Sequence, residues 1–210
     1  MTPKEAMYEK AGQKLVEALE KRHFTAQYCA TAEEARAAIL SKIGPEKVVG
    51  FGGSETMAQL GILDALRAKK QPMLDRDAVP AEERNEMMRK ALLSDVFLMS
   101  SNAVTEDGCL VNLDGRGNRV AALTFGPEQV IVAVGMNKVT ADLDAALKRV
   151  RHYAAPMNAQ RFPGQSPCRV TGRCADCTSP DSICASLVIT RLCKVPGRIH
   201  VVVIGQDLGM

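Results

Sequence analysis

Hydrophobic and polar positions along the chain follow two periods, which predict helices and strands in alternation. Apolar residues at helical spacing predict helices over residues 4–22, 31–43, 55–70, 80–92 and 140–153. Short apolar runs predict strands over residues 24–29, 47–51, 95–99, 129–134 and 198–204, with a short edge strand over 72–74. Runs as continuously apolar as 129–134 are typical of parallel strands that are covered on both faces of the sheet.

The middle of the chain breaks this alternation. Short strands are expected over residues 103–105, 109–111 and 120–123, with Asp107-Gly108 and Asp114-Gly115 as the turns between them. Residues 154–165 are expected to form a loop. The whole pattern predicts a three-layer α/β fold with a mostly parallel sheet that includes some antiparallel pieces.

The predicted strand over residues 198–204 follows a cysteine-rich segment, residues 166–193. Because a strand follows it, we expect this segment to be a loop insertion within the fold and not a detached tail. We expect residues 1–210 to form one domain, since a chain of 210 residues can bury a large core.

The composition narrows the function classes. A hydrophobic fraction of 46% excludes disorder over most of the chain, and a net charge of +3 with 4% aromatic residues argues against nucleic-acid binding. The longest apolar runs are far shorter than the roughly 20 residues of a membrane-spanning helix, and residues 1–20 carry no apolar signal core. These features predict a cytoplasmic protein without a membrane span.

A glycine loop between a predicted strand and a predicted helix is the first candidate binding site. It contains Gly52, Gly53, Ser54 and Thr56. Glycines let backbone N–H groups come close to a ligand, and a helix N-terminus favours an anion. The loop has neither the Gly-Lys-Ser/Thr ending of a P-loop nor the full spacing of a dinucleotide-binding loop. The alternative is that Ser54 only caps the following helix.

A second candidate follows the predicted strand over residues 95–99, at the sheet edge where ligands of α/β proteins bind. Glu106 would act there as a nucleophile or a base if it were partly desolvated. The alternative is a solvated carboxylate in a hairpin turn, next to Asp107-Gly108.

A third candidate is the segment 112–120, which holds two glycines, Asn118 and two arginines. Either Arg116 or Arg119 could clamp a carboxylate or a phosphate with two hydrogen bonds. The alternative is a surface turn with exposed arginines.

Asn137 and Lys138 follow the predicted strand over residues 129–134. They would reach the same crevice, because the carboxyl ends of parallel strands converge at one edge of the sheet. The alternative is that Lys138 only precedes a helix cap at Thr140.

Five of the seven cysteines lie within residues 168–193, and the odd total argues against a disulfide framework. Cys168, Cys174, Cys177 and Cys184 supply four thiolates, enough for a zinc ion or an iron–sulfur cluster. Their spacing matches neither a zinc ribbon nor the bacterial ferredoxin pattern. The alternatives are reduced structural thiols, or a redox dithiol formed by Cys174 and Cys177.

Several motifs occur together in a characteristic order. They are Gly52-Gly53-Ser54, Ser101–Glu106, Asp114–Val120, Phe125-Gly126-Pro127, Val134–Lys138, Pro167–Cys177 and the ending Gly205–Gly209. No one of them is specific, but their order and spacing resemble the LUD-domain family, of the lactate utilization protein C type. The resemblance covers nearly the whole chain.

The resemblance implies a fold similar to the NagB/RpiA/CoA-transferase-like superfamily. It also implies a role beside iron–sulfur proteins that oxidise L-lactate to pyruvate in bacteria. The leading hypothesis is therefore a subunit or accessory protein that binds a small anionic metabolite and works with iron–sulfur oxidoreductase subunits. Association with copies of itself is compatible with this hypothesis.

Two other functions stay open at this point. In CoA transferases of this superfamily, a glutamate before a glycine-containing turn attacks the thioester, and Thr105-Glu106-Asp107-Gly108 looks similar. A stand-alone CoA-transferase-like or sugar-phosphate-isomerase-like enzyme would then use Glu106 as its catalytic residue. The other alternative is a non-catalytic ligand sensor.

Overall fold

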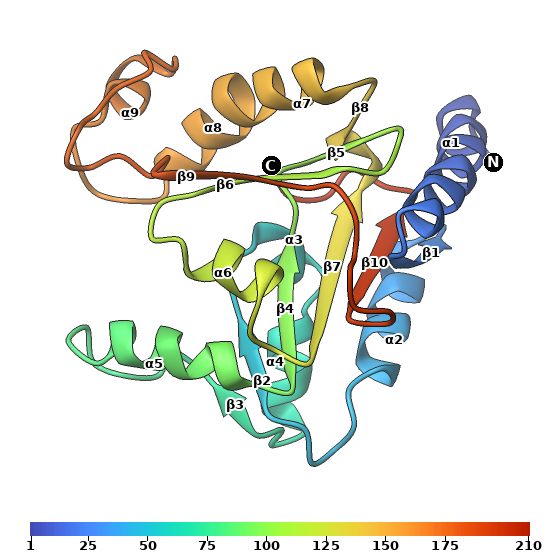
Figure 1. Ribbon diagram of the computed structural model, residues 1–210, viewed down its shortest axis with the longest axis horizontal. Helices are drawn as coiled ribbons and strands as arrows, with labels where there is room; N and C mark the ends of the chain where they lie inside the picture. The colour runs from blue at the N-terminus through green and yellow to red at the C-terminus, as the bar shows by residue number, and fades with distance from the viewer.

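A six-stranded parallel sheet forms the centre of the molecule in the computed structural model, which describes all residues, 1–210 (Figure 1). Each pair of neighbouring strands is parallel. From one edge to the other the strands are β1 (Thr25–Cys29), β10 (Ile199–Ile204), β7 (Gln129–Gly135), β4 (Val96–Ser100), β2 (Val49–Phe51) and β3 (Met73–Leu74). The two central strands, β7 and β4, are the most apolar and are buried along almost their whole length.

Helices cover this sheet on both faces. On one face lie α2 (Ala32–Ser41), α3 (Glu55–Gln59) and α4 (Ile62–Ala68). On the other face lie α1 (Pro3–Lys21) and α6 (Asn118–Thr124), and the short helix α5 (Arg84–Lys90) lies at the β3 edge. Alternate residues of β7 enter the two cores, with Val132 on the α1 side and Ile131 on the α2 side. This alternation explains why the strand is apolar at every position.

A second, smaller sheet lies beyond the carboxyl ends of the large one, in the upper half of Figure 1. Its strands are β8 (Val139–Thr140), β5 (Ala103–Thr105), β6 (Leu110–Asp114) and β9 (Ser186–Thr190), in that order. The β5–β6 and β6–β9 pairs are antiparallel, whereas β5–β8 is parallel. Three helices accompany this sheet: α7 (Leu143–Arg149), which continues as a π-helical turn over Val150–Ala154, α8 (Ala155–Ala159) and α9 (Pro167–Thr171).

The predicted α/β class, the mostly parallel sheet with antiparallel pieces and the insertion of the cysteine-rich segment before the last strand are confirmed. Three element predictions are wrong. Residues 120–123 form helix α6 and not a strand, because Gly117 adopts a left-handed conformation and starts a helix there. Residues 154–165 contain α8, and the helix predicted over 55–70 is two helices separated at Gly61, whose φ is +61°.

Strand β9 was not predicted. It lies on the surface, and its residues alternate between exposed and half-buried. The apolar run Leu187-Val188-Ile189 was the available signal, but it is only three residues long. The pairing with β6 places it: five residue pairs join the two strands, from Leu110 with Thr190 to Asp114 with Ser186. This pairing ties the cysteine-rich segment to the second sheet.

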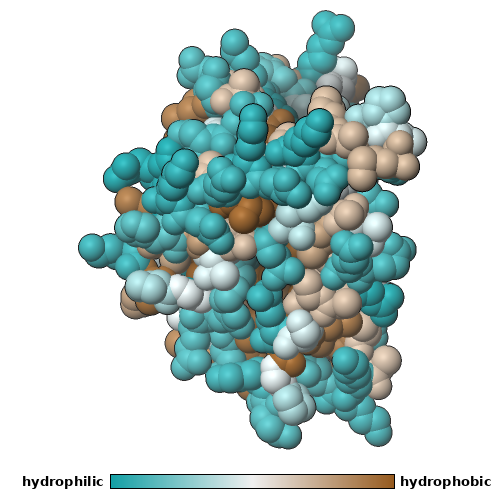
Figure 2. Space-filling view, turned by 90° about the vertical axis from the view of Figure 1, so that its right-hand side faces the viewer, coloured by the Kyte–Doolittle hydropathy of each residue, from teal (hydrophilic) through white to brown (hydrophobic).

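Hydrophilic residues predominate on the face of the molecule that carries α1, and hydrophobic residues show there only in separate spots (Figure 2). Helix α1 has a polar outer side and buries Gly12, Leu15 and Leu19. Not one of the helices combines the length and the apolar character needed to cross a membrane.

Candidate functional site

The carboxyl ends of four neighbouring strands bring polar side chains together between the two sheets. Ser100 is the last residue of β4, Lys138 follows β7 and Thr56 follows β2. The segment after β10, Gly205–Met210, crosses the same edge, and the chain ends there between the two sheets (Figure 1). A crevice outside the carboxyl ends of parallel strands is where open α/β sheets bind ligands.

Lys138 is the centre of this crevice. Its side chain is almost fully buried, with 3% of the residue exposed. The Nζ atom donates hydrogen bonds to Thr56 Oγ1 at 2.8 Å and to Ser100 Oγ at 2.9 Å. Burial, with the positive charges of Arg149 and Arg119 nearby, lowers the pKa of the Lys138 ammonium group to about 7. A buried ammonium group whose partners are hydroxyls is short of negative charge.

The segment after β10 covers Lys138. Asn137 Oδ1 accepts a hydrogen bond from the backbone N–H of Leu208 at 3.1 Å, and Thr56 Oγ1 donates to the Leu208 carbonyl at 3.4 Å. Gly209 lies so close that a Cβ atom on it would be 2.4 Å from Thr56 Oγ1 and 3.0 Å from Lys138 Nζ. The structure therefore brings Thr56, Asn137 and Lys138 together under one backbone segment.

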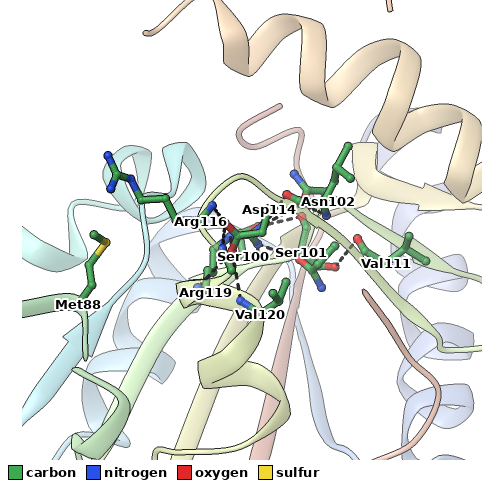
Figure 3. A network of polar contacts seen from close by, with 12 residues as sticks. Met88, Ser100, Ser101, Asn102, Val111, Asp114, Arg116, Arg119 and Val120 are labelled. Carbon is green, nitrogen blue, oxygen red and sulfur yellow. Dashed lines mark hydrogen bonds and ion pairs between the residues drawn. The ribbon is translucent and has the colours of Figure 1, made fainter. Parts of the chain in front are cut away.

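Arg119 reaches the crevice from α6, but its donors are occupied within the protein (Figure 3). Its terminal nitrogens donate to the Ser100 and Leu113 carbonyls and to the amide oxygens of Asn112 and Asn102, at 2.8–3.0 Å. Burial lowers the pKa of Arg119. The side chain joins the end of β4 to β6 and so holds Ser100 in place beneath Lys138.

One donor in this network has no partner. The Nδ2 atom of Asn112 is buried and makes no hydrogen bond, although the Oδ1 atom of the same amide accepts from Arg119. An amide N–H of this kind is free to bind an oxygen atom of a ligand or of a water molecule.

Asp114 lies at the N-terminal end of α6, within the segment 112–120 where we expected Arg116 or Arg119 to bind an external anion. Its carboxylate accepts hydrogen bonds from four backbone N–H groups, those of Arg116, Gly117, Arg119 and Val120, each at 3.2 Å. Asn118 is the first residue of α6 and is half-buried, and its side chain makes no hydrogen bond within the protein. The loop 112–120 thus supplies its own anion.

The glycine loop packs against two arginines. A Cβ atom at Gly52 would lie 2.9 Å from the side-chain carbons of Arg119, and one at Gly53 would lie 2.6 Å from the guanidinium group of Arg76. Ser54 caps α3 by accepting a hydrogen bond from the Met57 N–H at 3.2 Å. Ser54 therefore has the capping role that the sequence offered as an alternative. The Arg76 guanidinium group beside Gly53 had not been predicted from the sequence.

The structure does not bring Glu106 into this crevice. Glu106 follows β5 at the end remote from Asn102, its side chain is exposed, and its backbone N–H donates to the Thr140 carbonyl at 2.8 Å. The neighbouring Asp107 pairs with Arg22 of the α1 C-terminus. The structure thus places Glu106 in an exposed turn, apart from Lys138, and its role as a nucleophile or base stays a prediction.

Four of the cysteines line one cavity of about 220 Å³ beside the second sheet. They are the four predicted ligands, Cys168, Cys174, Cys177 and Cys184. Burial, and next the three neighbouring thiols, raise the pKa of the Cys184 thiol to about 11. All seven cysteines are free thiols, and Cys29, Cys109 and Cys193 are buried elsewhere in the molecule.

The cavity fits a single metal ion poorly. No group of three or more His, Cys, Asp or Glu side chains is arranged to hold one ion. A tetrahedral zinc site needs its sulfur atoms about 3.8 Å apart, because Zn–S bonds are about 2.3 Å long. The four thiols instead surround a larger space.

Several residues of the crevice had no clear signal in the sequence. Ser100 is the polar last residue of an apolar strand, and this position was the available signal. Arg149 is on α7 and donates to the carbonyls of Asn102 at 2.6 Å and Asn137 at 3.2 Å. Its place depends on how the second sheet folds over the first, which no local pattern encodes.

The fold and the sites define an α/β protein with a buried lysine at the carboxyl edge of a parallel sheet and a separate four-cysteine cavity. The chain belongs to the LUD domain family, since the model of that family, described as LUD domain, matches residues 12–204. This family is associated with lactate utilization.

Comparison with one solved structure supports the fold. A DUF162 family protein from Deinococcus radiodurans shares 14% sequence identity with this chain, with a TM-score of 0.57 over 94% of this chain and 98% of that one. eIF2B delta from Chaetomium thermophilum shares 13% identity, with a TM-score of 0.36 over 65% of this chain and 57% of that one. A search of curated proteins finds no match.

Proposed function

We propose that this chain binds the carboxylate of a small 2-hydroxy or 2-oxo acid at Lys138. In this proposal it acts as a subunit or accessory protein in the oxidation of L-lactate to pyruvate, beside iron–sulfur oxidoreductase subunits. The observation that carries the proposal is the buried Lys138 ammonium group, which has two hydroxyl partners and no carboxylate partner.

A carboxylate would complete the surroundings of this ammonium group. It would supply the negative charge. The Thr56 hydroxyl, which accepts from Lys138 and donates to the Leu208 carbonyl, would donate its hydrogen to the acid once that carbonyl moves away. The unpartnered Asn112 N–H belongs to the same network and is suited to a hydroxyl or carbonyl oxygen. Membership of the LUD domain family supports lactate and pyruvate as the first acids to test.

Binding requires the Gly205–Met210 segment to give way, because Leu208 and Gly209 occupy the space above Lys138. The contacts that hold this segment include hydrogen bonds of 3.1–3.5 Å through Asn137. Such bonds contribute about 1 kcal/mol each in net terms, so an acid bound by a desolvated charge pair can replace them.

Calorimetric titration with L-lactate and with pyruvate tests the proposal. Lys138→Met should weaken binding at least tenfold, whereas Lys148→Met, which removes an exposed lysine of α7, should leave it unchanged. The uncharged lactamide should not bind to either form. The idea of an anion site fails if neither acid binds the wild-type protein or if Lys138→Met binds as well as the wild type does.

The role beside partners is tested separately. In a reconstituted complex with iron–sulfur oxidoreductase subunits, L-lactate should reduce an artificial electron acceptor when this chain is present. Leaving the chain out, or replacing it with Lys138→Met, should reduce that rate. An unchanged rate without the chain would contradict the accessory role.

A further inference from the structure

We infer that Cys168, Cys174, Cys177 and Cys184 hold a [4Fe–4S] cluster in the cavity that they line, and that the cavity does not hold a single zinc ion. This site lies in the cysteine-rich segment, apart from the Lys138 crevice. The inference therefore goes beyond the proposed function and does not depend on it.

The first argument is convergence from separate pieces of chain. Cys168 is in α9, Cys174 and Cys177 are in the loop after it, and Cys184 precedes β9. The four thiols nevertheless line the same cavity. Structural thiols that only fill a core have no reason to surround one open space, because packed interiors leave few voids.

The second argument is size. The cavity has a volume of about 220 Å³, and its side chains do not form a group that could hold one ion. A zinc ion bridges four sulfurs directly and leaves no space between them. A [4Fe–4S] core binds each cysteine through a different iron, so it needs four thiols spread around a volume.

The third argument is the lining. Apolar residues of the second sheet and of α8, among them Leu113, Pro156 and Leu187, form one wall of the cavity. Arg151 forms another part, and its guanidinium group pairs there with Asp176. A fixed positive charge and a dry wall suit a cluster whose four thiolates give it net negative charge.

The backbone between the cysteines is shaped for this convergence. Gly172 ends α9 with a φ of +74°, and Asp176 has a φ of +50°. Aspartate is one of the few residues other than glycine that adopt this left-handed conformation readily. The resulting bend between Cys174 and Cys177 lets both thiols line the same cavity.

Binding is a ligand exchange. Each of the four thiols loses one proton to solvent, and each sulfur forms one bond to one iron of the core. Each new bond replaces a bond from that iron to a thiolate of the external dithiol, so no electron moves in this step. The core itself forms beforehand from four ferric ions and four sulfides under anaerobic conditions, and excess dithiol supplies the two electrons that reduce two of the irons.

Anaerobic reconstitution of the full chain tests the inference. We expect about four iron and four sulfide per chain and a broad absorption near about 400 nm that falls on reduction with dithionite. The double variant Cys174→Ser/Cys177→Ser should lose most of the iron and the absorption. The control Cys109→Ser, at a buried thiol outside the cavity, should retain both.

A labelling experiment keeps the test independent of any variant's folding. In the wild-type protein, reaction with iodoacetamide followed by mass spectrometry should modify Cys174 and Cys177, the two half-buried cavity thiols, in the metal-free form and spare them after reconstitution. Equal labelling in both forms would overturn the inference. So would a colourless protein that takes up one zinc per chain in preference to iron.

Discussion

At the scale of single residues, the two basic side chains expected at the crevice have opposite situations. Arg119 donates to four acceptors of the protein itself, and Lys138 donates to hydroxyls and lacks an anion. The sequence predicted that both side chains lie near the carboxyl ends of strands. The alternation of strands and helices along the chain was enough for that prediction. It could not separate the two roles, because the acceptors of Arg119 come from β4, from β6 and from the connection between β4 and β5, which meet only in the folded molecule.

The pKa of Lys138 predicts a pH dependence of acid binding. A bound carboxylate favours the charged ammonium group, so it raises the pKa of Lys138 above about 7 and binding takes up a proton. Affinity should be level below pH 7 and fall by about tenfold for each pH unit above it. Arg149 and Arg119, the charged groups facing Lys138, stay ionised throughout this range.

Calorimetry in two buffers of different ionisation enthalpy measures this proton uptake directly. Affinity for L-lactate that is constant from about pH 6 to about pH 9 would contradict the role of Lys138, since the ammonium group loses its charge across that range.

Arg119 gives a prediction about stability. Arg119→Met should lower the free energy of unfolding by about 3 kcal/mol, because it leaves the buried Asn112 amide oxygen without a donor and Asp114 without its cation. Urea denaturation measures the change. Arg116→Met removes an exposed arginine from the same loop and should change stability by less than about 0.5 kcal/mol. Equal effects would show that the network is not what stabilises this region.

At the scale of elements, the parallel sheet was predictable because its strands are apolar at consecutive positions. Helix α6 and strand β9 were not. The run Val120–Leu123 is apolar enough for a strand, and only the capping of its backbone by Asp114, with Gly117 in a left-handed conformation, makes it a helix. Strand β9 has an apolar run of only three residues, Leu187 to Ile189, and its pairing with β6 places it.

The segment after β10 is an element whose effect on the crevice can be tested with one methyl group. Gly209→Ala places a Cβ atom 2.4 Å from Thr56 Oγ1, at a φ of +65°, so the segment must move away from Lys138. The Lys138 amine of this variant should react with acetic anhydride about tenfold faster than in the wild type, because burial protects the amine in the wild type. Mass spectrometry measures the reaction.

Gly197→Ala is the matched control for this change. Gly197 has a similar φ of +76°, but a Cβ atom there would meet nothing within 4 Å. It imposes the same kind of backbone strain without displacing a neighbour, so Lys138 should react at the wild-type rate. Faster reaction in both variants would trace the effect to general destabilisation and not to the covering segment.

At the scale of the whole molecule, the two candidate sites lie in parts that are stabilised differently. The crevice rests on the six-stranded sheet, whose two faces bury separate apolar clusters. The cysteine-rich segment is joined to the rest through the β6–β9 pairing and the contacts of α8 and α9, and its loop residues from Gly172 to Ala185 contain no helix or strand. Removing an iron–sulfur cluster should therefore loosen the cysteine-rich segment and leave the six-stranded sheet unchanged.

Hydrogen exchange of the reconstituted and iron-free forms checks this last prediction. After iron is removed by a chelator under anaerobic conditions, peptides within residues 166–184 should exchange at least tenfold faster, because cross-links to one core restrict three separate pieces of chain. Peptides of β7 and β10 should exchange at unchanged rates, since their hydrogen bonds lie within the large sheet. Faster exchange in β7 would mean that the segment supports the whole fold. Unchanged exchange in 166–184 would mean that the thiols hold no core at all.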